Sequence, residues 1–177
     1  MSKKNCVVAV FKSHDQAEGA IRKLQKDGFD MKQLSIVGKD VHTEEHVVGY
    51  YNAGDRMLYW GKQGAFWGGF WGLLFGSAFF WVPGVGPLLV AGPLVMWIVG
   101  VLEGAAVLGG VSALGAALAS IGIPKNSIVQ YETEVKNGKL LLVAHGTVAD
   151  VERAKDLLHQ TQATTTTVHV ERAAVGV

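Results

Sequence analysis

The sequence has almost no charge over its middle third. Between Gln63 and Pro124 the only charged side chain is Glu103, while the other 30 acidic and basic residues lie in the flanking segments. The charges nearly cancel, with 16 Lys and Arg against 15 Asp and Glu, so no strong overall field attracts nucleic acid. The single cysteine, Cys6, excludes an internal disulfide. These features argue against a nucleic-acid partner, a disulfide scaffold and a disordered chain.

The N-terminal 48 residues have the pattern of a strand, a helix and a second strand. Residues 6–11 are an apolar run that predicts the first strand, and Leu34-Ser-Ile-Val37 predicts the second. Between them, Ser13 lies three positions before Gln16, which is the spacing of a helix N-terminus, and Gly28 is expected to end the helix. Four apolar residues follow Gln16 at helical spacing: Ala17, Ala20, Ile21 and Leu24.

The C-terminal segment, residues 124–177, repeats this plan. Residues 128–135 and 139–144 are predicted strands joined by a hairpin at Asn137-Gly138. Thr147 and Asp150 open a helix, and the β-branched run 164–170 is a closing strand. Two βαβ-like halves, residues 1–48 and 124–177, predict an α+β fold: a ferredoxin-like sandwich with helices on one face of an antiparallel sheet.

The segment between the halves is expected to be an aromatic linker, residues 49–63, followed by an apolar helical hairpin, residues 64–123. Two spans are predicted, at about 64–82 and about 88–110, and residues 65–82 would form a helix of about 27 Å. This length is close to a bilayer core of about 30 Å. Glycines four residues apart would form a groove for close helix contact: Gly64, Gly68, Gly72, Gly76, Gly100 and Gly104.

Aromatic side chains accompany these glycines and are expected at the membrane interface or in subunit contacts: Tyr59, Trp60, Trp67, Trp71, Trp81 and Trp97. The expected partners are therefore a lipid bilayer and further copies of the chain. Two spans place both halves on one side of the membrane, and the flanking Arg56, Lys62 and Lys125 favour the cytoplasmic side. The alternative is a self-assembling cytoplasmic particle that buries the hairpins inside.

Few residues suggest chemistry. Glu103 could mark an ion or proton path in a small pore or carrier, or lie at the interface where a span ends. His42 and His46 are four residues apart but lack the zincin order and a third ligand, so they are weak metal candidates. The sequence predicts no catalytic residue, no cofactor and no identifiable small-molecule ligand, and we expect a non-enzymatic protein.

The combined pattern resembles the general stress protein 17M-like family of small bacterial proteins. The resemblance is carried by residues 7–11, 20–24, 28–29 and 34–38 in the first half. It continues in Gly122-Ile123-Pro124, Tyr131-Glu132 and residues 138–143. It implies a stress-associated, membrane-associated bacterial protein without a defined reaction. Together with the topology expected from the flanking cations, this predicts a place in the bacterial inner membrane with both termini in the cytoplasm.

Overall fold

The computed structural model describes residues 5–39, 77–82, 85–103 and 112–170. Six strands form one sheet in the order β3-β4-β2-β5-β1-β6, and each neighbouring pair is antiparallel. The strands are β1 (Asn5–Phe11), β2 (Leu34–Lys39), β3 (Ser77–Val82), β4 (Gly86–Ala91), β5 (Leu140–Gly146) and β6 (Thr165–His169).

Two βαβ units interleave at the centre of this sheet. The first is β1, α1 (His14–Lys26), the short helix η1 (Met31–Gln33) and β2, and the second is β5, α7 (Val148–His159) and β6. Strand β5 lies between β1 and β2, and β1 lies between β5 and β6. The two strands of each unit are therefore not neighbours, and a strand of the other unit lies between them.

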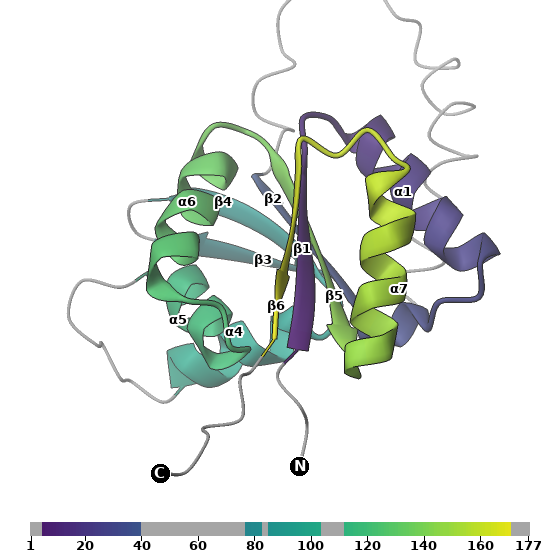
Figure 1. Cartoon of the computed structure of the whole chain (residues 1–177). Helices are drawn as coiled ribbons and strands as arrows, with labels where there is room; N and C mark the ends of the chain where they lie inside the picture. Colours follow the sequence, from purple (N-terminus) through teal and green to yellow (C-terminus); the bar gives the residue numbers. More distant parts are fainter. Residues whose placement is uncertain (1–4, 40–76, 83–84, 104–111, 171–177) are drawn as a thin grey trace, which may run out of the picture.

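Helices cover both faces of the sheet, as Figure 1 shows. Helices α1 and α7 cover one face, and α4 (Leu94–Glu103), α5 (Ala113–Ser120) and α6 (Lys125–Lys136) cover the other. Along β1, Val8 and Val10 join the core under α4–α6, whereas Val7 and Ala9 join the core under α1 and α7. The two helices predicted from the βαβ halves, α1 and α7, do share one face, as expected. The expectation that helices cover only that face is wrong, because such continuously apolar strands must be buried on both sides.

The apolar segment also departs from the predicted helical hairpin. Ser77–Val82 and Gly86–Ala91 are antiparallel strands, and β4 also pairs with β2. The two predicted helical spans are therefore wrong over these residues. Within the described part of the chain, no helix has the length and apolar character needed to cross a membrane. The segment instead contributes to the chain's own core through Leu88, Val90, Leu94, Ile98, Leu114 and Leu118.

Residues 128–135 are helical, not a strand. They belong to α6, and the buried Ile128, Tyr131 and Val135 recur at helical spacing. Asn137 and Gly138 end this helix rather than turning a hairpin: Gly138 N–H donates to the Val135 carbonyl, and Lys139 N–H to the Glu134 carbonyl. Gly138 has φ +78°, so the same Asn-Gly pair serves as a helix C-cap.

Candidate functional site

The outer face of helix α4 is apolar and uncovered within the described residues. Leu94 and Ile98 point into the core, whereas Met96 is 73% exposed. Gly100, one turn further on, is exposed, and a Cβ built there meets no atom within 4 Å. The helix has no charged residue before Glu103. We call Met96 and Gly100 the α4 outer face.

Four of the residues predicted from sequence lie in described elements. Trp97 is partly buried and packs against the core under α4–α6, and Trp81 in β3 lies opposite Pro87 of β4. Among the described residues, Gly100 meets no side chain that a Cβ would displace. Glu103 is the last residue of α4. The structure brings none of these four together into a polar site.

The remaining predicted residues lie outside the described part of the chain: Gly64, Gly68, Gly72, Gly76, Gly104, Tyr59, Trp60, Trp67, Trp71, His42 and His46. In the described ranges, no group of three or more His, Cys, Asp or Glu side chains could hold a metal ion.

A row of titratable side chains that the sequence did not reveal crosses the sheet near the chain termini. Cys6 on β1 lies opposite His145 on β5 and opposite His169 on β6. Directly opposed residues of an antiparallel ladder point to the same face, and Cys6 belongs to the core under α4–α6. We call His145, Cys6 and His169 the histidine row. No sequence spacing could predict it, because it depends on the register of three strands.

Tyr131 of helix α6 closes over this row. Its hydroxyl lies 2.8 Å from His169 Nε2 in a buried hydrogen bond, and the two rings meet edge to face with centroids 5.9 Å apart. At the other end of the row, His145 Nε2 is shielded from solvent and has no hydrogen-bond partner in the part of the chain that the structure describes. Among the described residues, His169 therefore has a hydrogen-bond partner for its Nε2, whereas His145 has none for its Nε2.

Burial sets the protonation state of the whole row. Desolvation lowers the pKa of His145 to about 4 and also lowers the pKa of His169. It raises the pKa of the Cys6 thiol to about 12, and it is the largest cause of the raised pKa of Tyr131. All four groups are therefore neutral at pH 7, and Cys6 is not poised as a nucleophile.

A shallow polar depression of about 320 Å³ lies on the opposite helical layer, between α1 and the end of α7. It is lined by Asp15, Gln16, Gly19, Ala20, Lys23, Gln160, Thr161 and Gln162. None of the residues predicted from sequence to be functional lies there.

Residues 6–79 match the family model of the heat induced stress protein YflT domain. This match supports a stress-related role and the resemblance to a general stress protein family, while the narrower 17M-like assignment stays a prediction. No curated protein and no solved structure matches the chain. The matched region runs from β1 into β3, but its strands β1 and β2 are joined through β5, which lies beyond it.

Proposed function

We propose that this chain is a non-enzymatic, stress-related protein that acts as a self-associating assembly, with the α4 outer face as a contact between copies. The observation that carries this proposal is an exposed Met96 beside an uncovered Gly100 on a helix without charge before its last residue. An interior helical glycine costs about 1 kcal/mol relative to alanine. No neighbour within the described chain requires this glycine, and close approach of a second α4 would require it.

A second copy suits this face better than a bilayer core. Helix α4 has 10 residues, about 15 Å at 1.5 Å per residue, which is half of a hydrocarbon core of about 30 Å. Two copies of the face can meet around a twofold axis without opposing like charges, because its residues are uncharged. The assembly corresponds to the particle alternative, placed in the cytoplasm, rather than to the membrane anchor or to a pore using Glu103.

We also propose that the interleaved units are ferredoxin-like. Strand order β2-β5-β1-β6 with one helix after β1 and one after β5 supports this assignment. Strands β3 and β4 then extend the sheet beyond β2, and α4–α6 cover the face that two βαβ units leave open.

The test is detergent-free fractionation of cells followed by sizing by light scattering. A large detergent-independent species is expected, and Met96→Lys and Gly100→Leu should each reduce its mass. Val129→Lys is the matched control, because Val129 is a 65% exposed apolar residue on another helix, α6. Circular dichroism checks that each variant is folded. A monomer of about 19 kDa, recovery only in a detergent-released membrane fraction, or equal effects of all three variants would contradict the proposal.

A further inference from the structure

The histidine row lies at one end of the sheet, where protonation of its imidazoles would act on the ends of three strands. Cys6 is near the start of β1, His169 ends β6 and His145 is near the end of β5. Figure 1 shows that these strand ends lie at the end of the sheet from which both termini leave. Adjacent strands are about 4.8 Å apart, so the two histidines flank Cys6 at a separation of about 10 Å.

The layer over the row carries few charges that could stabilise an imidazolium. Helix α5 has no charged residue, and α4 has Glu103 at its last position. On α6, Glu132 accepts a hydrogen bond from Ser112, and Glu134 forms an ion pair with Lys139. The other charged residues of α6 are Lys125 and Lys136, both cations.

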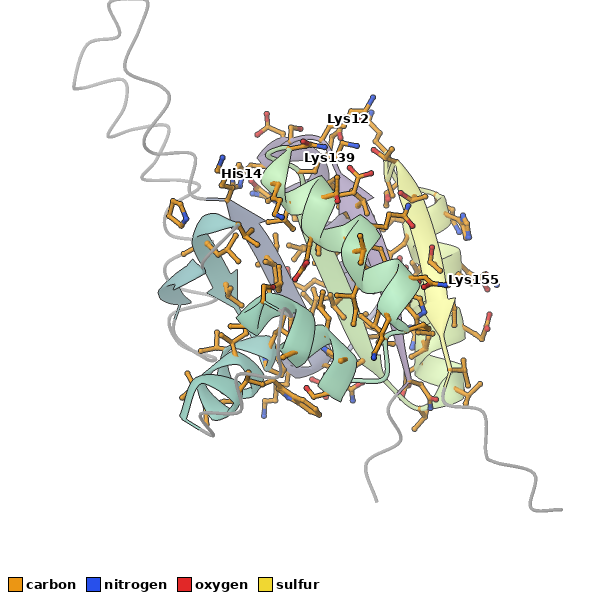
Figure 2. All side chains as sticks on the ribbon, turned by 90° about the vertical axis from the view of Figure 1, so that its left-hand side faces the viewer. Lys12, His14, Lys139 and Lys155 are labelled. Atoms are coloured by element: carbon orange, nitrogen blue, oxygen red, sulfur yellow. The ribbon has the colours of Figure 1, made fainter. Side chains whose placement is uncertain are left out.

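The neighbouring strands do not add a counter-charge among the described residues. On β2, the residues that share this face near the row are uncharged, and Lys39 is a cation at the far end of the strand. Figure 2 shows Lys12, His14 and Lys139 near one another at one end of the molecule. Lys12 follows the last residue of β1 and Lys139 precedes the first residue of β5, at the strand ends away from Cys6 and His145. Asp150 belongs to the capping box of α7, on the other face of the sheet. Cys6 within the row and Tyr131 over it are neutral titratable neighbours of the histidines.

We propose that the histidine row is an acid-sensitive latch: protonation of His145 and His169 loosens helix α6 from strands β5 and β6. Two cations would then lie on either side of a neutral thiol in a desolvated layer, which is costly without partners. A neutral imidazole has one acceptor nitrogen and an imidazolium has none. If the Tyr131 hydroxyl donates to His169 Nε2, protonation of His169 removes that acceptor, and the hydroxyl must turn its oxygen toward the new N–H. This proposal does not depend on self-association.

The direction of the pH effect follows from the lowered pKa values. An unfolded histidine has a pKa of about 6.5, whereas that of folded His145 is about 4. The unfolded state therefore binds more protons between these values, so stability is full above pH 6.5 and falls as the pH drops toward 4. For His145 alone, the unfolding equilibrium constant should rise on the order of 100-fold between pH 7 and pH 4.

Amide hydrogen exchange of the full chain at pH 7 and pH 5, corrected for intrinsic rates, tests where this loosening occurs. Amides of α6, β6 and the end of β5 should lose protection at pH 5 before those of α1 and β2. The double variant His145→Leu/His169→Asn should lose this pH dependence. The matched control His159→Gln should keep it, because His159 is an exposed histidine in the last turn of α7.

A second measurement keeps the proposal testable if the double variant does not fold. NMR titration of the wild-type imidazole rings should give a pKa of about 4 for His145 and a pKa below the ordinary histidine value for His169. Ordinary values near 6.5 for both rings would overturn the latch. Uniform loss of protection across all helices, or an equal effect of His159→Gln, would overturn it as well.

Discussion

The hydroxyl of Ser35 caps a helix that begins 59 residues later in the sequence. Leu94 N–H donates to Ser35 Oγ at 3.1 Å in a buried hydrogen bond. Leu94 is the first residue of α4, so a side chain of β2 satisfies one of the free N–H groups at the start of that helix. The first half of the chain thereby fixes where the apolar segment leaves the sheet.

Ser35→Ala should lower the free energy of unfolding by about 1–3 kcal/mol, because the Leu94 N–H would be left buried and unpaired. Urea unfolding followed by circular dichroism measures the change. The control is Ser120→Ala, since Ser120 Oγ donates to the Ala117 carbonyl within the turn of its own helix. Equal small losses in the two variants would mean that Ser35 does not cap α4.

Gly92→Ala should lower the free energy of unfolding more than Ser35→Ala does. Gly92 has φ +92°, and a Cβ there would clash with the Leu34 carbonyl oxygen and lie 2.8 Å from Ser35 Cα. Both are backbone atoms that cannot move without displacing β2. We therefore expect the free energy of unfolding to fall by more than about 3 kcal/mol, or the protein not to fold. Gly19→Ala, within helix α1 at a position where a built Cβ meets no described atom within 4 Å, should be neutral or stabilising by up to about 1 kcal/mol. A well-folded Gly92→Ala protein with unchanged thermal stability would contradict this close approach.

Tyr131→Phe should destabilise the protein by about 1–3 kcal/mol, because it leaves the buried His169 Nε2 without its partner while the ring still fills its place. The comparison is Thr133→Ala on the same helix, whose hydroxyl makes an exposed hydrogen bond to the Val129 carbonyl. That variant should change stability by less than about 0.5 kcal/mol. Denaturant midpoints distinguish the two, and equal midpoints would argue against an important Tyr131–His169 contact.

Gly138→Ala should cost about 1 kcal/mol, because Gly138 adopts φ +78° to end α6. For Gly19→Ala we expect the opposite effect on stability. Gly19 lies within α1, and a Cβ built there meets no described atom within 4 Å. That substitution should stabilise by about 0.5–1 kcal/mol. Thermal unfolding of the two variants should therefore move in opposite directions, and a shift in the same direction would refute the argument.

A fragment ending at residue 79, where the family match ends, should not fold cooperatively. Strand β1 pairs with β5 and β6, and β2 pairs with β4 and β5, all of which lie after residue 79. Circular dichroism of the fragment should show no cooperative thermal transition. Fragments 1–60 and 61–177 should instead recover the transition on mixing, because together they supply every described strand. A sharp transition in the isolated fragment 1–79 would contradict this interdependence.

The sequence by itself determined the local elements that carry strong signals. The strands near residues 6–11, 34–37, 139–144 and 164–170 are present, as are the helices opened by Ser13 and Thr147. Ser13 caps α1 through the Gln16 N–H, and Thr147 forms the full capping box with Asp150. Such signals can be recognised from sequence because each depends on residues three or four positions apart.

Only the tertiary structure decided the element types and the strand register that depend on residues far apart in the sequence. An apolar run such as residues 77–82 fits a strand or a buried helix equally well, and only pairing with β4 made it a strand. The Asn137-Gly138 pair fits a hairpin or a helix end, and burial of Ile128, Tyr131 and Val135 selected the helix end. The histidine row needed the register of β5, β1 and β6, which joins residues more than 100 positions apart in the chain. Local spacing contains no information about that register, since hydrogen-bonded strand pairing is what sets it.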